Sequence, residues 1–172
     1  MRIGLIGLGR IGAFHAETLS NLPSVTTLVV TDAAAAAIHA VVERHGVEAA
    51  ETPEKLLASG VDGVVVAAAT DAHPDLIIAA AEAGVPVFCE KPVAKTMADG
   101  LAVARRVAGT GVPIQIGYPR RFDKGFAAVR AAVVSGELGW VHTVRSTTLD
   151  PAPPPPAYLA VSGGIFRDCS IH

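Results

Sequence analysis

Three glycines near the amino terminus constrain the fold of this chain more than any other feature. Gly7, Gly9 and Gly12 follow a short apolar run, and the segment 11–22 that they open has helical spacing. A second apolar run ends at Asp32, 20 residues after Gly12. A glycine pattern alone would be weak, but between a strand, a helix and an acidic residue it predicts a βαβ unit that binds a dinucleotide.

The loop residues have distinct predicted roles in cofactor binding. Gly7 permits a tight turn, Gly9 lets a pyrophosphate approach the main chain, and Gly12 allows the helix to pack closely. Arg10 and Ile11 begin the helix, whose amino terminus is expected to face the phosphates. We therefore predict these five residues as the phosphate-binding part of a cofactor site.

Asp32 sets the predicted choice of cofactor. Its carboxylate is expected to accept hydrogen bonds from the adenosine ribose. The same carboxylate would repel a 2'-phosphate, and alanines rather than an arginine follow it in the chain. The sequence therefore favours NAD over NADP.

Strands and helices are expected to alternate as far as residue 117 without an internal repeat. Hydrophobic residues make up 51% of the chain and aromatic residues only 5%, a balance typical of buried parallel strands and close-packed helices. The predicted fold class is α/β, with a Rossmann-type doubly wound parallel sheet. The expected strands cover 2–6, 25–30, 47–50, 63–68, 85–89 and 114–117, and the later helices cover 33–45, 53–59, 73–83 and 97–109.

The sequence changes in character beyond residue 123. A helix is predicted over 126–135, and the alternation over 140–149 predicts a half-exposed strand of an antiparallel sheet. The prolines of 151–156 favour an extended linker, and 163–172 is expected to begin a further helix. We predict a Rossmann domain over 1–120, and over 121–172 the start of an incomplete α+β open-sheet domain of a truncated protein.

Composition and patterning exclude several functional classes. The formal net charge is −2, with no basic stripe of the kind that binds nucleic acid. Apolar stretches are interrupted before the roughly 18 residues that a membrane span needs, and no export signal is apparent, so a cytoplasmic protein is expected. Cys89 and Cys169 form no metal-binding or disulfide pattern, and no metal is expected.

Two polar groups follow neighbouring predicted strands, at the sheet edge where open α/β sheets bind ligands. Thr70 and His73 follow the strand over 63–68, and Glu90 and Lys91 follow the strand over 85–89. A role as a helix cap is an equally good interpretation of His73. For Lys91, a function is favoured over an ordinary lysine in a turn.

Together these motifs resemble the glucose-fructose oxidoreductase and inositol 2-dehydrogenase (Gfo/Idh/MocA) family. Within the family, the ending over 163–172 most resembles that of the inositol 2-dehydrogenases. The motifs that carry the resemblance are, in chain order, Gly7 to Gly12, Ala69-Thr70 with His73, Glu90-Lys91-Pro92, the segment 117–123, and Gly163-Gly164 with Asp168 and His172.

The resemblance implies that Lys91, Asp168 and His172 form the catalytic set. Oxidation of an alcohol requires a base with a pKa near the operating pH, and His172 matches the family's catalytic histidine. Asp168 precedes His172 by four residues, so on one helix they would share a face, with Asp168 orienting the substrate or relaying its proton.

Further roles follow from the same resemblance. Lys91 is expected to hydrogen-bond both the substrate and the nicotinamide ribose, and its peptide bond to Pro92 is expected to be cis. Thr70 and His73 are expected on the nicotinamide side of the cofactor, Glu90 is expected to contact the cofactor, and Tyr118 is expected beside the substrate.

The expected function is that of an NAD-dependent dehydrogenase that oxidises a secondary hydroxyl of a cyclic polyol or sugar, with myo-inositol as the first candidate. An NADP-dependent sugar reductase of the same family and a non-catalytic NAD-binding regulator remain as alternatives. Family members are about twice as long and use their second domain to assemble, so a full-length homo-oligomer is expected. The present chain alone is expected to lose most catalysis.

Overall fold

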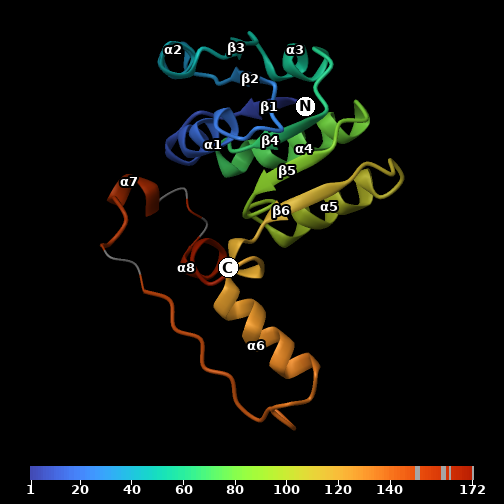
Figure 1. Ribbon diagram of the computed structural model, residues 1–172, viewed down its shortest axis with the longest axis vertical. Coiled ribbons are helices and arrows are strands. Elements are labelled where there is room, and N and C mark those ends of the chain that lie inside the picture. The colour runs from blue at the N-terminus through green and yellow to red at the C-terminus, as the bar shows by residue number, and fades with distance from the viewer. Residues whose placement is uncertain (150–151, 160–161, 163, 172) are drawn as a thin grey trace. The chain divides into compact units, whose positions relative to one another are not determined.

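The computed structural model describes residues 1–149, 152–159, 162 and 164–171 (Figure 1). By its internal contacts the chain divides into two compact units, Met1–Gly117 and Tyr118–His172.

The first unit is built on a six-stranded sheet in which every pairing of neighbouring strands is parallel (Figure 1). Its order is β3-β2-β1-β4-β5-β6, so the strand order reverses between β1 and β4, and ligands of such sheets bind outside that point. This arrangement confirms the predicted Rossmann-type α/β fold. The strands are β1 (Arg2–Ile6), β2 (Thr27–Thr31), β3 (Glu48–Ala49), β4 (Gly63–Val66), β5 (Val87–Glu90) and β6 (Ile114–Gly117).

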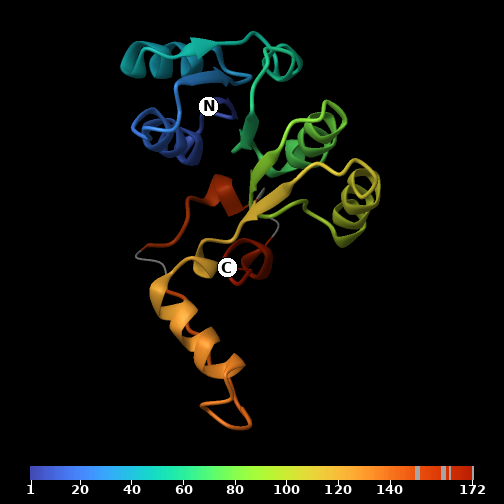
Figure 2. The same ribbon diagram turned by 45° about the vertical axis from the view of Figure 1, so that its right-hand side comes forward.

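Helices cover both faces of this sheet (Figure 2). Successive side chains of β1 point to opposite faces, so Leu5 packs in one hydrophobic cluster and Ile6 in the other. The first cluster joins α1 and α2 to the sheet through Ala16 and Val41, and the second includes residues of α3, α4 and α5. These elements are α1 (Arg10–Ser20), α2 (Ala35–His45), α3 (Pro53–Leu57), the 3-10 turn η1 (Thr70–Ala72), α4 (His73–Glu82) and α5 (Met97–Val107).

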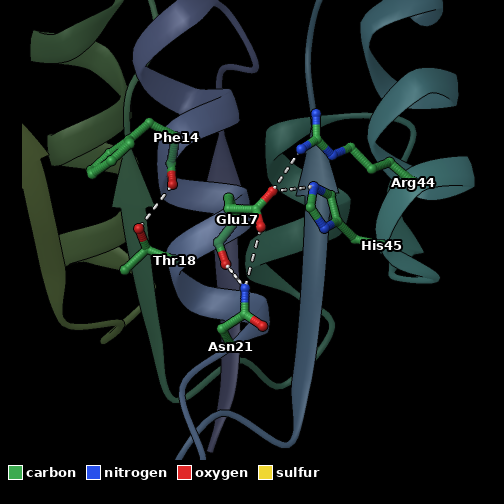
Figure 3. Close-up of polar contacts among 6 residues, drawn as sticks. All are labelled: Phe14, Glu17, Thr18, Asn21, Arg44 and His45. Carbon is green, nitrogen blue, oxygen red and sulfur yellow. Dashed lines mark hydrogen bonds and ion pairs between the residues drawn. The ribbon is translucent and has the colours of Figure 1, made fainter.

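Helices α1 and α2 are also joined by polar contacts on their outer surface (Figure 3). Arg44 Nη2 donates to Glu17 Oε2 at 3.0 Å, and His45 Nε2 lies 3.8 Å from the same oxygen. Asn21 Nδ2 donates to the main-chain oxygen of Glu17 at 2.7 Å. Because Arg44 and Glu17 are largely exposed, we expect this ion pair to contribute less than about 1 kcal/mol.

The second unit contains η2 (Pro119–Arg121), α6 (Lys124–Val134), α7 (Pro156–Leu159) and α8 (Ile165–Asp168). Asp123 caps α6, since its Oδ1 accepts from the main-chain nitrogens of Gly125 at 2.9 Å and Phe126 at 3.1 Å. This cap explains why the helix begins before the predicted start at 126. The predicted domain boundary after residue 120 lies inside η2.

Two secondary-structure predictions for the second unit are wrong. Residues 140–149 form no strand, and a strand needs a neighbour for its main-chain groups that the described part of the chain does not provide. Pro156 begins α7 instead of continuing an extended linker, because proline is well tolerated in the first turn of a helix. Gly163 and His172, the ends of the last predicted helix, lie outside the described residues.

Candidate cofactor and substrate site

The glycine loop after β1 has the geometry that its predicted roles require. Gly7 has a φ of +93°, and a Cβ there would lie 2.4 Å from the main-chain nitrogen of Ala68. A Cβ on Gly12 would lie 1.9 Å from the carbonyl oxygen of Gly7. A Cβ on Gly9 would meet no described atom within 4 Å. Gly7 and Gly12 thus allow close packing, while Gly9 leaves the main chain open.

The amino terminus of α1 is suited to an anion. Its N-cap residue, Gly9, makes no side-chain cap, and the first turn contains no acidic residue. The first amide groups of a helix lack partners within the helix and carry a partial positive charge. Arg10 and Ile11, which begin α1, are exposed. The loop and this helix end therefore fit the pyrophosphate of a dinucleotide.

Asp32 is held beside this loop by main-chain amides. Its Oδ2 accepts a hydrogen bond from Leu8 N at 2.6 Å, and its Oδ1 accepts one from Ala34 N at 2.7 Å. The two contacts orient the carboxylate and leave lone pairs on both oxygens for ribose hydroxyls. The negative charge fits NAD and opposes the 2'-phosphate of NADP, as the sequence predicted.

Thr70 and His73 follow β4, and the structure gives them different environments. Thr70 is partly buried in η1. His73 is only 2% exposed, its Nδ1 lies 2.8 Å from the carbonyl oxygen of Pro92, and its Nε2 lies 3.0 Å from that of Ala68. Both ring nitrogens are thus engaged by main-chain oxygens. The structure thus places His73 in contact with the main chain, and its role in binding the cofactor stays a prediction.

Glu90 and Lys91 lie at the carboxyl end of β5, and the Lys91–Pro92 peptide bond is cis. Glu90 Oε1 lies 2.8 Å from His15 Nε2 of α1, and the side chains of Glu90 and His15 are 24% and 18% exposed. The hydrogen bond from His15 lowers the pKa of the Glu90 carboxyl against the opposing effect of burial. Lys91 itself is partly buried.

The remaining predicted residues belong to the second unit. Tyr118 is partly buried at the start of η2, and Asp168 is the last residue of α8. That one helix carries both Asp168 and His172 stays a prediction. The chain turns after Asp168, with Ser170 N donating to the oxygen of Ile165, and His172 lies outside the described residues.

His15 is the site residue that sequence reasoning missed. It follows Gly12 by three residues, nearly one helical turn, so its place on α1 is readable from the sequence. Its partner Glu90 is 75 residues away, and their contact depends on how α1 packs on the sheet. Only the three-dimensional arrangement shows the pair.

Among the described residues, no group of three or more His, Cys, Asp or Glu side chains could hold a metal ion. No described helix is both long and apolar enough to cross a bilayer.

Comparison with known proteins places this geometry in a family. Residues 1–118 match the GFO_IDH_MocA family, described as an oxidoreductase family with an NAD-binding Rossmann fold. The chain belongs to this family. The Rossmann unit Met1–Gly117 lies wholly within the matched range, so the family's cofactor, NAD, is the one that the loop and Asp32 fit.

Relatives extend this similarity to the whole chain. The chain is 41% identical to the myo-inositol 2-dehydrogenase of Thermotoga maritima, covering 100% of this chain and 52% of that protein. A myo-inositol dehydrogenase structure from Corynebacterium glutamicum is 36% identical with a TM-score of 0.84, covering 100% of this chain and 52% of that one. The scyllo-inositol dehydrogenase of Lactobacillus casei, solved with NAD(H) and scyllo-inositol, is 26% identical with a TM-score of 0.75, covering 81% and 42%. The chain thus spans about half the length of the curated relatives that it matches.

Proposed function

We propose that the protein containing this chain is an NAD-dependent dehydrogenase that oxidises a secondary hydroxyl of a cyclic polyol, with myo-inositol as the first candidate substrate. The observation that carries the proposal is the placement of Lys91. It follows β5, two strands from β1, at the sheet edge where the glycine loop also begins. The similarity to inositol dehydrogenases along the entire chain supports the substrate class.

The proposed chemistry assigns a task to each residue of the set. When bound, NAD supplies the acceptor for the hydride that leaves the substrate carbon. The glycine loop and the α1 amides bind the pyrophosphate, and Asp32 binds the adenosine ribose. Thr70 and Glu90 are proposed to line the nicotinamide side.

The proton of the substrate hydroxyl needs a separate acceptor. His172 is the proposed general base, and Asp168 orients the hydroxyl or relays its proton. The Lys91 ammonium donates a hydrogen bond to the hydroxyl oxygen and stabilises the negative charge that develops there. Tyr118 is proposed to border the substrate. The homo-oligomeric state and the cytoplasmic location expected from the sequence also remain proposals.

The test is reduction of NAD by the full-length protein with a panel of inositols, other cyclic polyols and sugars, and the same panel with NADP. We expect turnover with at least one inositol and a preference for NAD. Lys91→Ala should lower kcat by about a hundredfold or more while the Kd for NAD changes little. Lys124→Ala, a change at an exposed lysine of α6, is the matched control.

Two outcomes would contradict the proposal. Turnover with NADP alone would favour a sugar reductase and would remove Asp32 as the residue that selects the cofactor. Tight NAD binding without turnover of any compound in the panel would favour a regulator that senses the cofactor.

A further inference from the structure

Two histidines hold the segment that carries Lys91, and they come from different sides of the sheet. His15 belongs to α1, which packs on one face, and His73 begins α4, which packs on the other. His15 contacts the Glu90 side chain, and His73 contacts the carbonyl oxygen of Pro92. Lys91 is thus the one residue between two anchored neighbours.

The contact of His15 with Glu90 is built into the packing of the first unit. The His15 ring also packs edge to face against Phe88, with ring centroids 5.8 Å apart. Phe88 and Glu90 are two residues apart on β5 and therefore point to the same face, toward α1. A half-buried imidazole with both polar and aromatic partners has little freedom to move.

The contact of His73 is more deeply enclosed. The ring is 2% exposed and joins two carbonyl oxygens, Pro92 O after β5 and Ala68 O after β4. One side chain thereby bridges two neighbouring strand ends. Pro92 itself is buried, so the link is shielded from competing water.

Both histidines lie close to the glycine loop, each through one neighbouring residue. The Gly7 main chain packs so closely on Ala68 that no side chain fits between them, and Ala68 is the other partner of His73. On the other face, Gly12 packs on Gly7, and His15 follows Gly12 by three residues. The cofactor loop and the Lys91 segment are therefore connected through one residue on each face of the sheet.

We infer that His15 and His73 are positioning residues that fix Lys91 relative to the dinucleotide loop. This inference rests on the proposed function, in which the Lys91 ammonium must meet both the nicotinamide ribose and the substrate hydroxyl. A lysine on an unsupported turn would sample many positions, and a displacement of about 1 Å in a reacting group can cost about a hundredfold in rate.

Variants can separate positioning from support of the fold. His15→Gln keeps a donor near the place of Nε2, whereas His15→Leu removes it. His73→Asn keeps a donor near the place of Nδ1, toward Pro92, whereas His73→Gln keeps one near Nε2, toward Ala68. His39→Leu, at an exposed position of α2, is the matched control. All variants are compared at temperatures well below their own unfolding midpoints.

The first measurement does not need turnover. Reductive methylation of Lys91 is followed by mass spectrometry with and without NAD, with the exposed Lys124 as internal reference. We expect NAD to slow methylation of Lys91 in the wild type, and this protection to fall severalfold in His15→Leu and His73→Gln. His15→Gln, His73→Asn and His39→Leu should retain most of it.

The second measurement is kinetic. In the full-length protein, His15→Leu and His73→Gln should lower kcat by about ten- to a hundredfold, with the Kd for NAD changed by less than about threefold. If the wild type turns over no polyol, the proposed function fails, and the methylation experiment alone decides the role of the histidines. Equal NAD protection in all variants, no protection in the wild type, or a loss of NAD affinity that matches the loss of kcat would each overturn the inference.

Discussion

A pair of glycine substitutions in the loop separates the folding role of this segment from its binding role. Gly9→Ala adds a Cβ where no described atom lies within 4 Å, and Gly12→Ala adds one 1.9 Å from Gly7 O. The two positions are three residues apart in the same loop. We expect Gly12→Ala to destabilise the fold and Gly9→Ala to weaken NAD binding without destabilising it.

The magnitudes follow from the local geometry. At Gly12 the new carbon lies about 1.5 Å inside the 3.4 Å at which ordinary contact begins, against a main-chain atom that cannot turn away. Such overpacking costs about 1–3 kcal/mol, reduced by up to about 1 kcal/mol because alanine favours the helix. In the middle of this range, a net cost of about 1–2 kcal/mol, the unfolding midpoint of a chain of this size should fall by about 2–8 °C, at about 2–4 °C per kcal/mol.

Gly9 is expected to behave differently because its backbone angles, φ −64° and ψ −168°, are open to alanine. A poorer N-cap and a more restricted unfolded chain act in opposite directions, by about 0.5–1 kcal/mol each, so the unfolding midpoint should stay within about 2 °C. The methyl group would occupy the side from which a pyrophosphate approaches. We expect the Kd for NAD to rise by about tenfold or more.

Thermal unfolding followed by circular dichroism and NAD titration by calorimetry measure these effects on the same samples. Separate roles for the two glycines would be refuted if Gly9→Ala lowered the unfolding midpoint as much as Gly12→Ala, or if it bound NAD as tightly as the wild type.

Two further predictions concern the end of β5. Burial, together with the charge of Glu90, raises the pKa of the Cys89 thiol to about 12. In a Cys169→Ser background, maleimide should therefore modify Cys89 at least about a hundredfold faster in the unfolded protein than in the folded protein. Equal rates would contradict this environment of Cys89. The Glu90 pKa is lowered in the folded state, so its stabilising effect is complete above about pH 5 and is lost as the pH falls below the ordinary value of 4.5. In denaturant titrations, Glu90→Gln should therefore lose less free energy of unfolding than the wild type between about pH 5 and pH 3. Identical pH profiles of the two proteins would contradict a Glu90 pKa that His15 lowers.

Local patterns were enough to predict most of the first unit. The runs over 2–6 and 114–117 form β1 and β6 with the predicted bounds, and α2 ends at Gly46, whose φ of +64° suits glycine, as the sequence indicated. These predictions succeeded because apolar periodicity and turn residues act over a few positions. Other predicted elements differ from the observed bounds by one or a few residues, since helix and strand ends depend on tertiary contacts.

The errors have a common physical origin in contacts between distant parts of the chain. The alternation over 140–149 satisfies the rule for a strand, but a strand also requires a neighbouring strand. The position of His73 after β4 did not indicate that its Nδ1 would lie beside the carbonyl oxygen of Pro92, 19 residues away. His15 was overlooked because nothing near it in the sequence indicates Glu90. Residue type and spacing locate an edge of the sheet, but they do not say which partner a side chain finds there.

The order of strands in the sheet has a consequence for the time course of synthesis. β1 is made first, yet it lies at the centre, between β2 and β4. Its first neighbour is complete when Thr31 has been added, but its second is complete only at Val66. At the usual rate of about 5–20 residues per second, one edge of β1 thus stays unpaired for seconds after the other is covered. During synthesis, β1 therefore stays open to incorrect strand pairing for longer than a strand whose neighbours are made directly after it.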